Sequence, residues 1–262
     1  MTNNKPLSGV GVLVTRPEHQ AEELCRKIEQ NGGKAIRFPV LQIDDIDDTH
    51  QLNQQIDRLE HFDIAIFISP NAVKKAINII QTKKKWPNHV KIAAVGKTSA
   101  KALDSLGLIA DIFPSARFNS EALLSLDELQ NIDGKSIIIF RGEGGRELLA
   151  QTLKSRGANV EYAECYKRTK PKSDVAKLMK HWARGEINVI VTTSNEGLHN
   201  LYDMVGQLGR QWLIKTPMIV VSERGADQAL KLGFKQRPNV AVQASDDAIV
   251  ESLIEWRSLQ CA

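Results

Sequence analysis

The chain has 262 residues, of which 42% are hydrophobic and 25% charged, and a formal net charge of +4. This is the composition of an ordinary soluble globular protein, and no apolar run approaches the length of about 20 residues that a bilayer span needs. The basic residues are scattered, so we expect neither a nucleic-acid partner nor a membrane.

Cysteine usage and the N-terminal stretch indicate a cellular setting. The three cysteines, Cys25, Cys165 and Cys261, have no metal-ligand spacing and cannot all pair. The first residues lack the charged-then-apolar pattern of a signal peptide. We therefore expect a reducing, cytoplasmic environment.

The sequence contains an internal repeat of two similar segments. Residues 10–43 align with residues 135–168 at a constant offset of 125, without a gap from Val12 and Ile137 onward. Each copy has the pattern of a strand, a helix and a second strand. In the later copy, an apolar run at 137–140 precedes a glycine-rich turn and a helix that Gly157 ends.

The remaining segments continue the alternation of strands and helices. The patterns predict strands at 10–14, 35–43, 64–68, 91–95, 109–113, 137–140, 160–166, 188–191 and 218–221. They predict helices from Thr15 to about Gln30, over 49–59, from Ser69, from Gly96, over 120–129, after 145 and around 247–250. Strands separated by helices indicate two similar α/β domains with parallel sheets, divided either in tandem near residue 130 or with the chain crossing between them.

Ligands of open parallel sheets bind beyond the carboxyl ends of the strands, so the residues that follow each strand are candidates for a site. They are mostly hydroxyls, amides and glycines with a few cations. Many stand at predicted helix starts, where backbone N–H groups favour carboxylates or phosphates, although each is also explained as a plain helix cap. The candidates are Thr15, Arg16, Ser69, Pro70, Asn71, Gly96, Lys97, Arg141, Gly142, Glu143, Thr193, Ser194, Asn195 and Ser222.

Other kinds of site have no motif here. The sequence has no phosphate-binding GxxxxGK[ST] loop, no dinucleotide fingerprint, no paired histidines or cysteines of metal-ligand spacing and no GxSxG elbow. We therefore expect no cofactor and no metal. Tyr166 ends the second copy of the repeat where the first copy has Leu41, and a phenol there can assist a leaving hydroxyl or simply pack in the strand.

Several segments together resemble the uroporphyrinogen-III synthase family over nearly the whole chain. Their order and spacing carry the resemblance, since no single motif is specific. The segments are VLVTRP at 12–17, FPVLQI at 38–43, IFISPNAV at 66–73, AVGKTSAKAL at 94–103, the 137–168 segment ending in ECYKR, VTTSNEGL at 191–198 and the capped strand at 218–224.

The resemblance implies two α/β domains joined by a two-stranded β connection at 38–43 and 163–168. One domain then combines residues 1–37 with 169–262, and the other is 44–162. It further implies that a monomer without cofactor closes linear hydroxymethylbilane, handed over by the preceding enzyme, to uroporphyrinogen III with loss of water and inversion of ring D.

In the family's pattern, Tyr166 assists departure of the hydroxyl, Ser194 is a hinge-side serine, and the other candidates line a substrate cleft. Ser222-Glu223-Arg224 departs from the glycine and threonine residues that many relatives carry. The alternative is a two-domain cleft protein that binds a small anionic ligand without catalysis.

Overall fold

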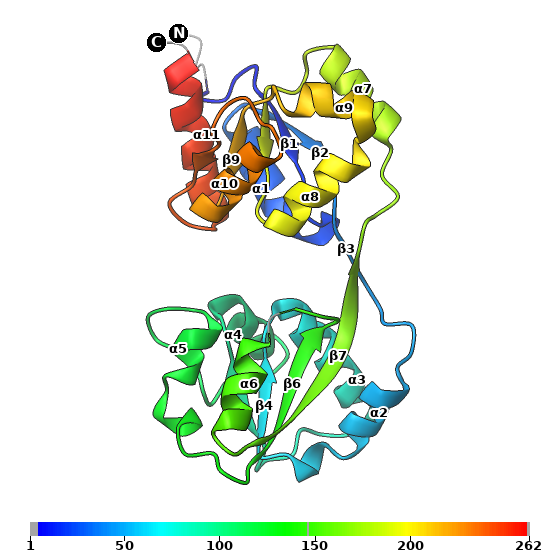
Figure 1. Cartoon of the computed structure of the whole chain (residues 1–262), viewed down its shortest axis with the longest axis vertical. Coiled ribbons are helices and arrows are strands. Elements are labelled where there is room, and N and C mark those ends of the chain that lie inside the picture. The colour runs from blue at the N-terminus through cyan, green and yellow to red at the C-terminus, as the bar shows by residue number, and fades with distance from the viewer. Residues whose placement is uncertain (1–4, 146, 261–262) are drawn as a thin grey trace. The chain divides into compact units, whose positions relative to one another are not determined.

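The computed structural model describes residues 5–145 and 147–260, which form two compact units. The first unit runs to Gln42 and resumes at Thr169, and the second is Ile43–Arg168. Each is a sheet covered by helices (Figure 1). Residues 163–168, expected as a linker, are part of β7 (Asn159–Thr169), and β3 (Gln42–Asp44) lies next to β7 in the second sheet.

The sheet of the first unit has the strand order β10-β9-β8-β1-β2, and all its neighbours are parallel. The strands are β1 (Gly11–Val14), β2 (Lys34–Arg37), β8 (Val189–Val191), β9 (Met218–Val220) and β10 (Asn239–Val240). Helices α1 (Glu18–Gln30) and α11 (Asp246–Gln260) pack on one face, and α7 (Val175–Ala183), α8 (Asn195–Met204), α9 (Gly206–Leu213) and α10 (Glu223–Lys231) pack on the other. Because both faces are covered, β1 and β8 are apolar and buried throughout.

The second sheet has the order β3-β7-β6-β4-β5. Its remaining strands are β4 (Ile64–Phe67), β5 (Lys91–Ala94) and β6 (Ser136–Gly142), and β7, β6, β4 and β5 run parallel. Helices α2 (His50–Asp57), α3 (Pro70–Lys83) and α4 (Lys97–Asp104) cover one face, and α5 (Ser120–Leu124) and α6 (Leu148–Ser155) cover the other. Short 3-10 turns at Leu59–His61 and Asp127–Leu129 complete the unit.

The two units repeat one topology, which confirms the predicted fold class. The order β2-β1-β8-β9-β10 corresponds to β7-β6-β4-β5 followed by a single bridge between Ala93 and Ile112. The strand expected at 109–113 is thus reduced to this bridge. Among residues 5–145 and 147–260, no helix has both the length and the apolar character to cross a membrane.

The first helix of the repeat begins at different places in the two copies. It begins at Glu18 in the first copy, whose counterpart is Glu143, but only at Leu148 in the second. Gly144 and Gly145 have φ angles of +67° and +110°, a left-handed backbone that glycine adopts readily and a helix does not contain. The glycine-rich turn therefore delays the helix instead of opening it.

Candidate functional site

The carboxyl ends of four neighbouring strands in the second unit carry most of the candidate residues. Because β7, β6, β4 and β5 run parallel and lie side by side, the residues at their ends meet at one edge of the sheet. We call this edge the second-unit rim. Its candidates are Tyr166, Arg141, Gly142, Glu143, Ser69, Pro70, Asn71, Gly96 and Lys97.

Tyr166 is fully buried in this rim, and its hydroxyl lies 3.0 Å from Ser69 Oγ. Ser69 is the N-cap of α3, as predicted: its Oγ accepts the N–H of Ala72 at 3.1 Å, and Pro70 opens the helix. The Arg168 side chain lies close to the phenol, with Nη2 3.5 Å from the hydroxyl. A helix N-terminus and a guanidinium both favour negative charge, so this part of the rim is electropositive.

A β-bulge turns Tyr166 toward Ser69. Arg141 pairs with Glu164 and the next residue, Gly142, pairs with Tyr166, which leaves Cys165 without a residue opposite it. Tyr166 consequently joins the hydrophobic cluster under α2, α3 and α4. Without the extra residue, strand alternation would place its side chain on the opposite face.

Gly142 makes room for the tyrosine ring. A Cβ at this position would lie 2.6 Å from Cε2 and 2.7 Å from Cζ of Tyr166. The backbone N–H of Glu143 donates to the Tyr166 carbonyl at 2.8 Å, which fixes the end of β6 against β7. The glycine that follows β6 thus has a packing role that its position in the sequence did not reveal.

Arg141 is a buried cation with only 2% of its surface exposed. Its Nη1 donates to Glu147 at 3.1 Å, its Nε donates to the Gly142 carbonyl at 3.1 Å, and its Cζ lies 4.3 Å from the centre of the Tyr162 ring. The Tyr162 hydroxyl donates to Glu147 at 2.6 Å, and this bond, with Arg141 second, lowers the pKa of Glu147. Burial, and then Glu147, raises the pKa of Tyr162 to about 12. Arg141 Nη2 has no hydrogen-bond partner among the described residues.

The remaining candidates of this rim lie at helix starts. Asn71 is in the first turn of α3, and Gly96 is the N-cap of α4, where no side chain caps the helix. The Lys97 ammonium lies 4.6 Å over the ring of Phe118. The amides at both helix starts and the Lys97 charge suit an anionic ligand.

The first unit has an equivalent rim at the ends of the neighbouring strands β9, β8 and β1, which we call the first-unit rim. Its candidates are Thr15, Arg16, Thr193, Ser194, Asn195 and Ser222. Ser194 caps α8 by accepting the N–H of Gly197 at 3.0 Å, and Ser222 caps α10 by accepting the N–H of Gly225 at 3.1 Å. Both serines were among the candidates that the sequence also explained as helix caps.

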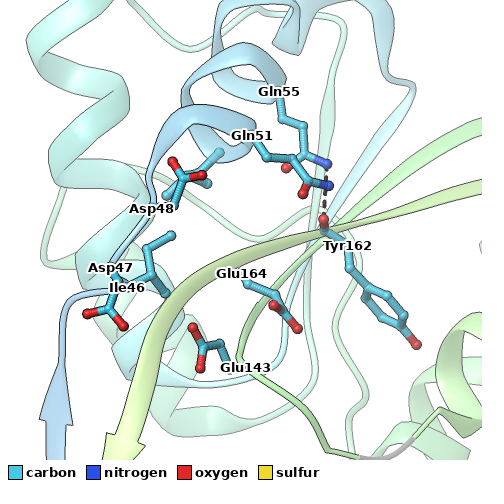
Figure 2. Close-up of a pocket in the computed structure, with 9 residues that line it drawn as sticks. Ile46, Asp47, Asp48, Gln51, Gln55, Glu143, Tyr162 and Glu164 are labelled. Atoms are coloured by element: carbon cyan, nitrogen blue, oxygen red, sulfur yellow. Dashed lines mark hydrogen bonds between the residues drawn. The ribbon is translucent and has the colours of Figure 1, made fainter.

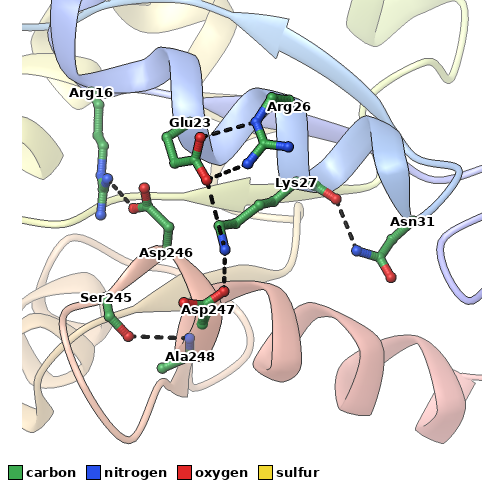
Figure 3. Close-up of polar contacts among 9 residues, drawn as sticks. All are labelled: Arg16, Glu23, Arg26, Lys27, Asn31, Ser245, Asp246, Asp247 and Ala248. Atoms are coloured by element: carbon green, nitrogen blue, oxygen red, sulfur yellow. Dashed lines mark hydrogen bonds and ion pairs between the residues drawn. The ribbon is translucent and has the colours of Figure 1, made fainter.

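Thr15 and Arg16 differ from the prediction. The helix begins at Glu18, and Thr15 does not cap it: its hydroxyl donates to the Val191 carbonyl in β8 at 2.9 Å, with only 3% of the residue exposed. A bond to the neighbouring strand therefore replaces the expected cap. Arg16 forms an ion pair with Asp246 at the start of α11 (Figure 3).

Sequence similarity to other proteins extends over almost the whole chain. A family model described as uroporphyrinogen-III synthase HemD matches residues 22–251. The uroporphyrinogen-III synthase of Escherichia coli (strain K12) is 38% identical over 246 residues, 93% of this chain and 100% of that protein. The one of Salmonella typhimurium is 36% identical over the same shares. The chain belongs to the uroporphyrinogen-III synthase family.

Solved structures of uroporphyrinogen III synthases share the fold. A mutant from the extremely thermophilic bacterium Thermus thermophilus has a TM-score of 0.64 at 18% identity, covering 97% of this chain and 100% of that one. The protein from Helicobacter pylori 26695 has a TM-score of 0.60 at 13% identity, with 94% and 99% covered. As a member of this family, the chain is an enzyme, a cyclising lyase of porphyrin biosynthesis, and a binding module without catalysis is not favoured.

The departure at Ser222-Glu223-Arg224 has a partial structural account in this family member. Glu223 forms an ion pair with Arg237 at 2.8 Å, whereas Arg224 is exposed. The acidic residue in this turn is therefore held by an arginine from outside the motif.

Glu143 is surrounded by other acidic residues, unlike the other candidate site residues. With Asp47, Asp48 and Glu164 it lines a pocket of about 320 Å³, from which the ring of Tyr162 points away (Figure 2). None of the described lining residues is basic. Asp47 is ion-paired with Lys167, and the other three carboxylates disfavour a further anion. Across residues 5–145 and 147–260, no acidic, histidine or cysteine cluster is arranged to hold a metal ion.

Three further side chains lie near the second-unit rim and are not among the site residues predicted from the sequence: Glu147, Tyr162 and Arg168. Arg168 lies two residues after Tyr166, and Tyr162 lies four residues before Tyr166. Such even spacings are found between any residues along a strand, so they do not indicate a site. Glu147 reaches Arg141 across the glycine turn, and no sequence pattern links the two.

Proposed function

We propose that the chain closes hydroxymethylbilane to uroporphyrinogen III, and that Tyr166 in the second-unit rim assists the first step. Family membership supports the reaction. One observation carries the assignment to this rim: the Tyr166 hydroxyl lies 3.0 Å from Ser69 Oγ at the N-terminus of α3. This is the place in the second unit where a phenol, a helix N-terminus and the Arg168 guanidinium come together.

In the first step, the hydroxyl on the terminal methylene of ring A leaves as water. The C–O bond breaks as the pyrrole nitrogen lends its electron pair, and Tyr166 gives its proton to the departing oxygen, which leaves as water. The α3 N-terminus stabilises the phenolate that remains. Because the side chain is fully buried, substrate binding must displace a neighbour, and Arg168, whose Cζ lies 5.9 Å from the ring centre, is that neighbour in our proposal.

In the later steps, the protein must control geometry more than reactivity. Ring D attacks the electron-deficient methylene through its substituted carbon and forms a spirocyclic intermediate. The bond from that carbon to the methylene bridge of ring C then breaks, and the free carbon of ring D bonds to this bridge, which inverts the ring. The proton lost from that carbon returns to the Tyr166 phenolate, so that overall one water is lost. Spontaneous closure proceeds without inversion and yields the type I isomer, so holding the intermediate in the inverting geometry is the larger part of catalysis.

The substrate carries eight carboxylates, and the amide donors of each rim suit such groups. We assign them to the amides at the starts of α3, α4, α8 and α10, each preceded by Ser69, Gly96, Ser194 or Ser222. Lys97 adds a cation in the second unit. Backbone amides suit a flexible polycarboxylate because they bind oxygens without requiring one fixed side-chain geometry.

The direct experiment is to give the purified protein freshly made hydroxymethylbilane and to separate the type III from the type I isomer after oxidation. Exclusive formation of type I would rule out the proposed function. For the mechanism, Tyr166→Phe should slow type III formation while the protein stays folded. The matched control is Tyr202→Phe, since Tyr202 also lies under an arginine, Arg210 at 4.1 Å, but belongs to helix α8 of the first unit. Equal rates for both variants and the unchanged protein would return Tyr166 to a packing role.

We also propose that the protein works as a monomer in the reducing cytoplasm and receives its substrate from the preceding enzyme. Cys25 and Cys165 are buried, and neither forms a disulfide within residues 5–145 and 147–260, which agrees with a reducing setting. The substrate's spontaneous closure favours a short transfer between enzymes. Light scattering tests the monomer, and in a coupled assay direct transfer predicts that dilution of both enzymes leaves the type III yield unchanged.

A further inference from the structure

The outer side of β2 in the first unit borders a pocket that the proposed reaction does not use. The pocket has a volume of about 510 Å³ and lies between residues 34–39 on the strand side and residues of the 172–181 segment, at the start of α7, on the helix side. Six consecutive residues line the strand side, so the pocket follows β2 over its whole length. An extended segment fits this shape better than a compact molecule.

On its outer side, the backbone of β2 has no strand beside it among the described residues. β2 is the last strand of its sheet. Lys34 donates its N–H to the carbonyl of Val10, just before β1, at 2.8 Å, and Phe38, just after β2, donates its N–H to the carbonyl of Val14 in β1 at 3.0 Å. Because these directions alternate along a strand, the N–H and C=O groups of Ala35 and Arg37 point away from β1. In the part of the chain that the structure describes, nothing forms a hydrogen bond with these four groups.

The second copy of the repeat has the same edge occupied. β7 is the counterpart of β2, and β3 lies beside it on its outer side. The carbonyl of Tyr162, which corresponds to Arg37 at the offset of 125, accepts a hydrogen bond from Gln55 Nε2 at 3.0 Å (Figure 2). In the second unit, therefore, the chain itself supplies a strand and a donor to this edge. In the first unit, none of the described residues does so.

The residues that line the pocket carry a net positive charge. The charged residues that line it are Lys34, Arg37, Lys172, Lys177 and Asp174, a formal net charge of +3. Lys34 and Arg37 are ion-paired with glutamates of their own unit. Lys172 and Lys177 form no ion pair within residues 5–145 and 147–260, so their charges remain for a ligand.

We propose that the outer edge of β2 is a docking site for an extended, acidic segment of a partner protein. The segment adds as a strand beside β2, with backbone bonds to Ala35 and Arg37 and its carboxylates near Lys172 and Lys177. Positive charges on an edge strand discourage indiscriminate pairing with other strands, so an acidic segment is the one that this edge admits. The inference stands on the edge and its charges and is independent of the reaction.

The probe is a hexapeptide of alternating glutamate and valine with blocked ends, titrated into the ¹⁵N-labelled full chain. We expect saturable shifts of the amide signals of residues 34–39 and 172–178. Two comparison peptides separate the contributions: lysine with valine reverses the charge, and glutamate with proline keeps the charge but removes ladder N–H groups. Each should bind at least tenfold more weakly. Equal binding of the proline peptide, or the absence of saturable binding by the glutamate–valine peptide, would overturn the proposal.

Variants of α7 and its preceding loop test the charges. The double change Lys172→Glu and Lys177→Glu should weaken binding of the glutamate–valine peptide at least tenfold, with type III formation unchanged. Lys180→Glu is the matched control, because Lys180 is on the same helix, is exposed and does not line the pocket. Ala35→Pro removes one outward N–H and should also weaken binding. Unchanged affinity in the double variant would contradict the docking site, whatever the proline variant does to folding.

Discussion

Replacing Gly142 by alanine tests the packing that holds Tyr166 in the second-unit rim. The added Cβ would lie 2.6 Å from the nearest ring carbon, whereas ordinary contact begins at 3.4 Å, so one partner must move by about 0.8 Å. The Tyr166 ring is fully buried and has no open side. Such overpacking costs about 1–3 kcal/mol, and loss of the 3.0 Å contact with Ser69 costs about 1 kcal/mol more.

Alanine restricts the unfolded chain more than glycine does, and this effect offsets about 0.4–1 kcal/mol of the loss in the free energy of unfolding. We therefore expect Gly142→Ala to lower the free energy of unfolding by about 1–3 kcal/mol, measured by urea denaturation and circular dichroism. The same variant should lose type III formation, because the shifted ring takes its hydroxyl away from Ser69.

The matched control is Gly96→Ala in the same rim. There the nearest atom to an added Cβ is 4.0 Å away, and φ is −143°, which any residue adopts. The loss should stay below about 1 kcal/mol, the usual size at a site without a clash. Equal losses in the two variants would refute the argument that the Gly142–Tyr166 contact is tight.

Three further predictions concern ionisable groups. Tyr162→Phe removes the main cause of the low pKa of Glu147, so that pKa should rise toward 4.5 in a carbon-13 NMR titration. A carboxylate with a lowered pKa stabilises the fold above pH 4.5, and this stabilisation is lost on acidification. The variant should therefore lose less stability than the unchanged protein below that pH. His181→Gln should raise the pKa of Glu186 from about 2, because His181 is the largest cause of its lowering, and should flatten the loss of stability between pH 4.5 and about 2; an identical acid-unfolding curve would argue against the pair. Burial raises the pKa of the Cys165 thiol to about 12, so a disulfide reagent at neutral pH should modify it only in urea, and rapid labelling of the native protein at this position would contradict its burial.

Features that depend on neighbouring residues in the sequence were predictable. The repeat at an offset of 125 indicated two copies of one topology, and both sheets have it. Ser69, Ser194 and Ser222 were candidate helix caps in the sequence, because a cap bonds to an N–H only three residues later. Short-range geometry of this kind can be read from the order of residue types.

Thr15 shows the limit of such local signals. It precedes an arginine and a proline in the way a cap residue would, yet its hydroxyl bonds to Val191, which lies far along the chain in β8. The competing partner exists only once β1 and β8 are paired. Local pattern alone therefore assigned the wrong partner to a residue at the right edge of the sheet.

The sequence by itself determined the repeat, the alternation of strands and helices, the capped helix starts and the family. Only the tertiary structure decided which way Tyr166 faces, because the bulge at Cys165 arises from pairing β7 with β6 and reverses the alternation that runs from Tyr162. It also decided that Arg141 is buried against Glu147 and that the edge of β2 stays open while that of β7 is covered. The physical reason is that caps and periodicity act within a few residues, whereas strand register and burial are set by partners distant in the chain.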